Sequence, residues 1–222
     1  MSTSTDRTTA STAAPTLRRR SLFAMLALAA MPLSAPAHAD TAPAIATVQQ
    51  FNAALLGAMQ SGRQTGFSQR FEALAPAIDQ AFDLRAVLAV SVGPSWGALP
   101  QDQQSRLLDA FRRYTVASYL ANFNNYAGQS FTVSPETRAL GSDRQVVQSE
   151  IRSADGEATR FDYVMQPTAA GWKIVDVLVE GSISRVAVQR SDFRHILSSG
   201  GGEALLASLQ HKIADLSGGA LA

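Results

Sequence analysis

The chain has 222 residues, contains no cysteine and carries few charged side chains. The lack of cysteine excludes disulfide scaffolds, Cys-ligated zinc, iron–sulfur clusters and thiol nucleophiles. Charged residues make up 17% of the chain, below the usual quarter, which argues against a disordered or coiled-coil protein. Lys and Arg number 19 against 18 Asp and Glu, so the net charge of +1 favours no basic nucleic-acid surface.

Residues 1–39 have the pattern of a signal peptide that is cleaved after Ala39. Arg18–Arg20 precede an uncharged apolar run over residues 22–31, and residues 37–39 have the small-x-small form of a cleavage site. A membrane anchor is the alternative, but it needs about twenty mainly apolar residues, and two prolines follow this run closely. The segment also resembles a twin-arginine signal. We therefore expect export by the general secretory or the twin-arginine route.

Removal of this segment changes the charge of the protein. Loss of Arg7 and Arg18–Arg20 lowers the number of Lys and Arg from 19 to 15, and loss of Asp6 lowers Asp and Glu from 18 to 17. The mature chain, residues 40–222, is then slightly acidic, with a net charge of about −2. Nucleic acid is a poor candidate partner for such a chain.

The mature chain predicts helices, then strands, then helices again. Apolar residues recur at helical spacing over 44–60, 67–74, 82–90 and 100–126, with a break around Pro76, and again over 183–197 and 203–216, with a break at Gly200–Gly202. Alternation typical of strands covers residues 131–133, 147–151, 161–165 and 172–179, separated by short turns. We expect one α+β domain: a curved antiparallel sheet of about four strands with N- and C-terminal helices packed on it.

The predicted helix over residues 100–126 changes its apolar face along its length. In its first half an apolar stripe is formed by Leu107, Leu108, Phe111 and Tyr114. In its second half the formerly charged side is occupied by Val116, Tyr119, Leu120 and Phe123. Small polar residues then continue the first stripe: Thr115, Ser118 and Asn122. The helix must therefore face different neighbours along its length. A second packing element and a bound apolar ligand both explain this pattern.

No sequence motif establishes catalysis or a metal site. Gly93-Pro94-Ser95-Trp96-Gly97 has the spacing of a nucleophile elbow, but the segment before it reads as a helix and the next helix starts too late. His195 and His211, the histidines of the mature chain, lie on separate predicted helices without a metal-binding spacing. We therefore expect no metal and no cofactor.

Asp176 is an acidic residue within an otherwise apolar strand. Strand alternation places it with Trp172, Ile174 and Leu178, and a buried carboxylate needs hydrogen-bond partners. A structural hydrogen bond to a turn is one interpretation. A functional acid in a small enzyme that acts on a hydrophobic substrate is the other.

The C-terminal half carries a family resemblance. The strand Trp172–Gly181, read W-K-I-V-D-V-L-V-E-G, and the following Arg190-Ser191-Asp192-Phe193 resemble the MlaC family, also called the toluene-tolerance auxiliary components. Residues 75–83 and 188–193 most resemble its hopanoid-associated HpnM branch. One departure is Ser182-Ile183-Ser184, where many members read Val-Ser after Glu-Gly.

The resemblance implies a soluble periplasmic carrier rather than an enzyme. Such a carrier moves a lipid, here phospholipid or hopanoid, between the transporter components of the inner and outer membranes and binds those components transiently. It would enclose the lipid in an apolar cavity within one lipid-carrier domain, residues 40–222. We predict that the following residues line this cavity: Trp96, Phe111, Tyr114, Tyr119, Phe123, Phe161, Tyr163, Ile174, Val177 and Ile183.

Overall fold

The structure is a computed structural model that describes residues 41–62 and 64–221. The predicted signal peptide lies outside these residues. The helices are α1 (Thr41–Ser61), α2 (Phe67–Ala81), α3 (Leu84–Val92), the 3-10 helix η1 (Gly93–Ala98), α4 (Gln101–Asn122) and α5 (Arg185–Ser217). The strands are β1 (Ser130–Leu140), β2 (Arg144–Arg152), β3 (Ala158–Thr168), β4 (Gly171–Val179) and β5 (Ile183–Ser184).

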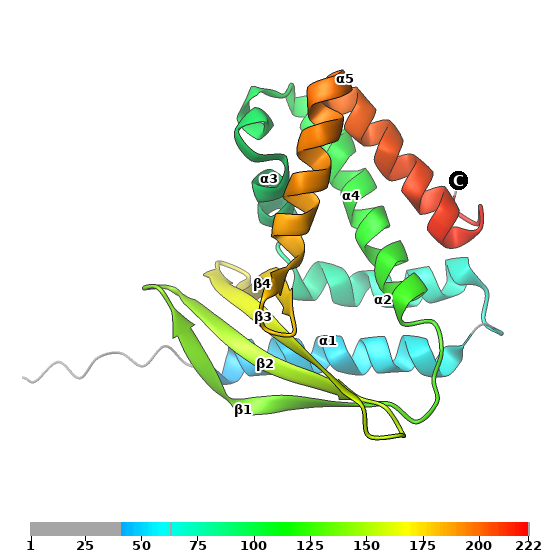
Figure 1. The fold of residues 1–222 in the computed structure, drawn as a ribbon, viewed down its shortest axis with the longest axis vertical. Coiled ribbons are helices and arrows are strands. Elements are labelled where there is room, and N and C mark those ends of the chain that lie inside the picture. The colour runs from blue at the N-terminus through cyan, green and yellow to red at the C-terminus, as the bar shows by residue number, and fades with distance from the viewer. Residues whose placement is uncertain (1–40, 63, 222) are drawn as a thin grey trace, which may run out of the picture. The chain divides into compact units, whose positions relative to one another are not determined.

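The five strands form an antiparallel meander in the order β1-β2-β3-β4-β5 (Figure 1). The predicted curved antiparallel sheet with packed helices is confirmed, but the strand count rises from about four to five. Ile183 and Ser184, predicted as the start of a helix, pair instead with Val179 and Leu178. A two-residue strand at the edge of the sheet is too short to leave a periodic signal in the sequence.

An irregularity in β4 changes which of its residues share a face. Val164 of β3 pairs with Asp176, but the next residue, Met165, pairs with Ile174, so the register shifts across Val175. Strict alternation had placed Ile174 and Val177 on opposite faces. The shift by one residue reverses the faces, and both side chains become buried.

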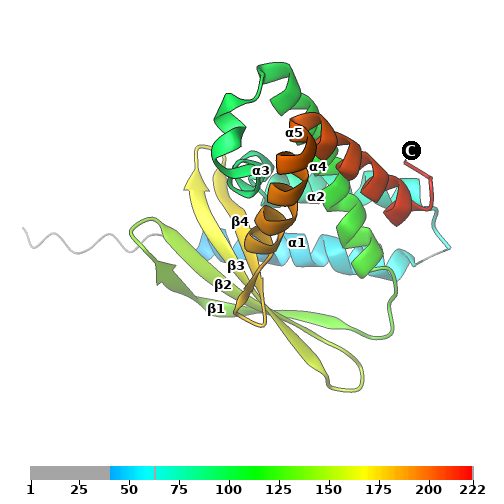
Figure 2. The same ribbon diagram turned by 45° about the horizontal axis from the view of Figure 1, so that its top comes forward.

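Helix α1 lies across the sheet (Figures 1 and 2) and is joined to three of its strands by buried hydrogen bonds. The Asn52 amide donates to Ser149 Oγ of β2 at 2.8 Å, and Ser149 Oγ donates to the carbonyl of Thr132 in β1 at 2.9 Å. Tyr163 of β3 donates its hydroxyl proton to Asn52 Oδ1 at 3.4 Å. These bonds satisfy the polar atoms of Asn52 that α1 buries, and they fix α1 on this face.

Helix α2 continues through Pro76, where the sequence predicted a break. Pro76 is exposed, and its ring removes the bond that an amide N–H would make to the carbonyl four residues earlier. Leu74 and Ile78 on either side are fully buried, so packing of this face offsets the lost bond. The chain turns instead at Phe82, which pairs with Ile174, and Asp83 then caps α3 by accepting a bond from the Ala86 N–H at 2.9 Å.

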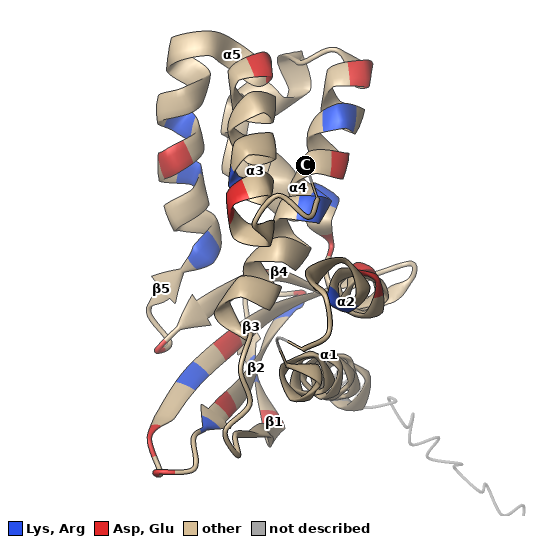
Figure 3. Cartoon of the chain, turned by 90° about the vertical axis from the view of Figure 1, so that its right-hand side faces the viewer, with Lys and Arg blue, Asp and Glu red and all other residues tan. Residues whose placement is uncertain are grey.

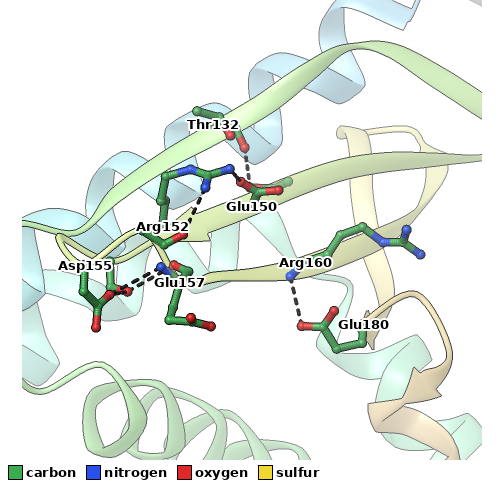
Figure 4. A network of polar contacts seen from close by, with 10 residues as sticks. Thr132, Glu150, Arg152, Asp155, Glu157, Arg160 and Glu180 are labelled. Atoms are coloured by element: carbon green, nitrogen blue, oxygen red, sulfur yellow. Dashed lines mark hydrogen bonds and ion pairs between the residues drawn. The ribbon is translucent and has the colours of Figure 1, made fainter.

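The hairpin between β2 and β3 follows the predicted Asp155-Gly156 turn (Figure 4). Gly156 has a φ of 94°, a conformation that glycine adopts without strain. The Ser153 hydroxyl and the Glu157 N–H donate to the Asp155 carboxylate and hold its pKa below the usual value. Arg152 contacts both Glu150 and the carbonyl of Gly156.

The predicted break at Gly200–Gly202 divides α5 into two helical halves. Gly200 and Gly201 have non-helical backbone angles, and the φ of 65° with a ψ of −157° at Gly201 is accessible essentially only to glycine. A Cβ at Gly202 would lie 2.5 Å from Gln103 Oε1, so α4 and α5 approach closely here. The first half runs from the sheet to this kink, and the second half returns along α4 (Figure 2). Within the described residues, no helix is both long and apolar enough to cross a bilayer.

The buried network around Asn52 yields a stability prediction. Asn52→Ala removes the donor to Ser149 Oγ and the acceptor of the Tyr163 hydroxyl, and it opens a cavity. We therefore expect it to lower the free energy of unfolding by about 2–4 kcal/mol. Urea denaturation should show a lower midpoint with an unchanged m-value. The matched control is Gln49→Ala, an exposed position on the same helix, which should unfold at the wild-type midpoint. Equal midpoints for both variants would show that the network does not hold α1.

Candidate ligand-binding cavity

A cavity of about 300 Å³ lies between the helices and the last strands of the sheet. Helix α4 forms one side, the first half of α5 another, and strands β3 and β4 a third, while the segment from α2 to α3 closes it. Its lining residues are Phe82, Leu84, Val87, Phe111, Tyr114, Thr115, Ser118, Tyr119, Asn122, Phe123, Phe161, Tyr163, Asp176, Val177, Val179, Arg185, Val186 and Gln189.

The change of face along α4 explains how this cavity arises. Leu107 and Phe111 are buried where the first half of α4 meets α5, whereas Val116 and Leu120 are buried on another side of the helix. Tyr119 and Phe123, which the sequence placed on the same side as Val116, line the cavity instead. The original stripe continues as Thr115, Ser118 and Asn122, and all three line the cavity. The helix therefore gains a second packing neighbour in α2, as one of the two explanations requires, and it also faces an unfilled space.

Aromatic rings form a continuous row along the cavity. Phe82, Tyr119, Phe123, Phe161 and Tyr163 follow one another with ring centroids 5.8–6.5 Å apart. They come from the end of α2, from α4 and its C-terminal boundary, and from β3. Burial raises the pKa of the Tyr119 and Tyr163 hydroxyls, so both remain protonated and neutral. The row presents a large apolar surface without charge.

Asp176 connects β4 to the start of α5. Its Oδ1 accepts bonds from the N–H groups of Val177 at 2.8 Å and Val186 at 3.1 Å, and its Oδ2 accepts the Ser184 hydroxyl. Ser184 in turn caps α5 by accepting a bond from the Ala187 N–H at 2.9 Å. A carboxylate at a helix N-terminus is also stabilised by the helix dipole. These contacts match the structural interpretation of Asp176.

Two further polar groups of the cavity have unused hydrogen-bonding capacity. Ser118 Oγ is buried and has no hydrogen-bond partner among the described residues. Arg185 is exposed, and no carboxylate in residues 41–62 or 64–221 lies within ion-pair distance of it. The cavity thus combines an aromatic side with polar groups on α4 and α5.

The structure brings together seven of the ten residues that the sequence predicted for the cavity. Those seven are Phe111, Tyr114, Tyr119, Phe123, Phe161, Tyr163 and Val177. The other three lie elsewhere. Trp96 is half-buried on η1, with the Arg85 guanidinium 5.9 Å from the centre of its ring, and Ile174 is fully buried where β4 meets Phe82. Ile183 is 53% exposed, because β5 is an edge strand.

Sequence reasoning missed several lining residues, most of them polar or near a turn. Arg185 and Gln189 are one helical turn apart on α5, in line with the buried Val186 and Phe193. This spacing indicates that both residues lie beside the buried face of α5. An Arg at the edge of an apolar stripe usually reaches solvent, however, so the spacing alone does not predict that Arg185 lines a cavity. Phe82 was placed at a helix start, and only the pairing of Phe82 with Ile174 brings it to the cavity.

The G-x-S-x-G segment does not form a nucleophile elbow. It forms η1 and follows helix α3, whereas an elbow joins a strand to a helix. His195 is exposed on α5, and within the described residues it forms no hydrogen bond or ion pair with Ser95 or Asp176. In the part of the chain that the structure describes, no group of three or more His, Asp or Glu side chains is placed to hold a metal ion.

Comparison with protein families shows which family the chain belongs to. The MlaC protein family matches residues 49–211, nearly three quarters of the sequence. The chain belongs to the MlaC family. Among solved structures, a phospholipid-binding protein from Ralstonia solanacearum, determined in complex with a phospholipid, has a similar fold with a TM-score of 0.69. The two chains are 22% identical over 78% of this chain and 98% of the other, a likeness that shows the fold. No curated protein matches this chain. Neither comparison distinguishes the HpnM branch.

The role of Asp176 can be tested through stability. Asp176→Ala removes the acceptor for Ser184 and for the Val186 N–H, so we expect a loss of about 1–3 kcal/mol in the free energy of unfolding. Asp176→Asn keeps an acceptor oxygen and should lose less. Thermal denaturation of both variants checks this order. A wild-type melting temperature for Asp176→Ala would contradict the proposed link between β4 and α5.

Proposed function

We propose that the mature protein is a lipid-binding protein that carries a phospholipid or a hopanoid through the periplasm. The observation that supports this most strongly is the aromatic-lined cavity in a member of the MlaC family. The phospholipid bound by the similar Ralstonia solanacearum protein adds support for this class of ligand. Burying an acyl chain is worth about 0.8 kcal/mol per methylene, so a lipid leaves a bilayer for water only very slowly unless a protein shields its chain.

Loading of a lipid requires the cavity to widen. Its volume of about 300 Å³ lies at the lower end of the range for small-ligand pockets, roughly 300–1,000 Å³, and a lipid with two acyl chains is larger than such ligands. The first half of α5 is the wall best suited to move. It ends at the Gly200–Gly201 kink, and its base is held by the bonds to Asp176. We propose that this half swings outward when lipid enters.

Export and membrane partners belong to the same proposal. The pattern of residues 1–39 supports cleavage of a signal peptide and release into the periplasm. A carrier must also deliver its lipid, and a membrane-bound transporter component that favours the widened form would trigger release by shifting the population toward it. We place such components at the inner and the outer membrane.

An enzyme with Asp176 as its acid is less well supported. A general acid must reach the substrate, but both oxygens of Asp176 accept hydrogen bonds from the chain itself. Those bonds anchor the start of α5. This structural role accounts for an acidic residue in an otherwise apolar strand. Family membership also favours a carrier over an enzyme.

A variant that fills the cavity tests the proposal. Ser118→Trp places a large ring into the space beside Tyr119, so we expect the protein to lose its bound lipid. Protein purified without detergent is extracted with organic solvent, and the extract is measured by mass spectrometry. The wild type should yield close to one lipid per protein, and the masses separate phospholipid from hopanoid.

The matched control is Ser105→Trp, an exposed position on the same helix that should keep the wild-type lipid content. Circular dichroism and melting temperature confirm that both variants fold. The same proteins should differ in moving a labelled lipid between two vesicle populations, with Ser118→Trp inactive. A wild type that carries no lipid and accelerates no transfer would refute the proposed function.

A further inference from the structure

The side of α5 that faces the cavity carries an unpaired cation. Helix α5 follows β5 directly (Figure 3). Its first residue, Arg185, lines the cavity together with Val186 and Gln189. It lies near enough to Tyr119 for its positive charge to oppose the rise in the pKa of that hydroxyl. Its guanidinium has five N–H donors, and no carboxylate within the described residues pairs with it.

The other charges around the cavity do not neutralise Arg185. Asp176 is the other ionic residue in the lining, and its oxygens are bound by Val177, Ser184 and Val186. Among the described residues it forms no ion pair with Arg185. Burial raises the pKa of the Tyr119 and Tyr163 hydroxyls, so these two groups remain neutral. The cation is therefore available to an anion that enters from outside the chain.

Helix α4 presents polar groups to the same space. Thr115 and Asn122 use their side chains to bond carbonyls within α4, but Ser118 Oγ is buried without a partner. A buried hydroxyl that makes no hydrogen bond costs about 1–3 kcal/mol, and a ligand with a polar group at this position removes that cost. The rings of the aromatic row present an apolar surface. The lining as a whole thus suits a ligand with both apolar chains and an anionic group.

We infer that Arg185 binds the phosphate group of a phospholipid whose acyl chains lie along the aromatic row. Guanidinium and phosphate form paired, charge-assisted hydrogen bonds, which a neutral polycyclic lipid cannot offer. This inference rests on the proposed function and narrows it: of the two lipid classes, the phosphate-bearing one is the ligand.

A competition between two lipids that differ in the phosphate tests this inference. Delipidated mature protein is incubated with vesicles that contain equal amounts of phosphatidylglycerol and digalactosyldiacylglycerol with identical acyl chains. The bound lipids are then extracted and quantified. We expect the wild type to favour phosphatidylglycerol by about tenfold, the effect of one charge-assisted contact. Arg185→Ala should lower the ratio to about one without lowering the total lipid bound, and Arg185→Lys should keep part of the preference.

The control variant is Arg194→Ala, which removes an exposed Arg from the same helix at a position that does not line the cavity. It should keep the wild-type ratio, whereas a general effect of surface charge on vesicle binding would lower it as well. An unchanged ratio in Arg185→Ala, or equal binding of both lipids by the wild type, overturns the role of Arg185 and leaves the proposed function intact. If the wild type takes up neither lipid, the proposed function fails and this inference fails with it.

Discussion

The cavity depends on how α5 is held at its two ends. At the sheet, Asp176 accepts bonds from Ser184 and from the Val186 N–H, which fixes the start of the helix above β4. At the far end, Gly201 has backbone angles that turn the chain back, and the second half of α5 packs on α4. Between these anchors, the first half of α5 spans the space that Thr115 and Ser118 leave unfilled. Loss of either anchor would leave the first half of α5 without a fixed position, and the cavity would change its shape.

The periodic features of the fold were predictable from the sequence, and the features that depend on distant partners were not. The strands, the break at Gly200–Gly202 and the change of face along α4 all follow from local spacing. The continuation of α2 through Pro76 depends on burial against the rest of the core. The register shift in β4 depends on pairing with β3, and it buries both Ile174 and Val177, which strict alternation places on opposite faces.

The residues of the candidate site also fall into two groups: those that the local sequence pattern predicts and those that only tertiary packing brings to the cavity. Aromatic residues such as Tyr119 and Phe161 were found because large rings in a helix stripe or a strand must be covered by something. Arg185 was missed because an Arg at a helix start is ordinarily solvated, and only the packing of α5 places it beside the rings. The cavity has aromatic residues on one side and, on another, a cation that pairs with no carboxylate of the described residues. The proposed function rests on these two features.

Photochemical crosslinking tests the location of the ligand most directly. Wild-type protein loaded with a phospholipid that carries a diazirine near the end of one acyl chain is irradiated, digested and analysed by mass spectrometry. We expect adducts on the cavity segments of α4 and the sheet, residues 111–123 and 161–179. Adducts confined to the separate pocket between η1 and α5, which is lined by Pro94, Arg190 and Arg194, would contradict this expectation.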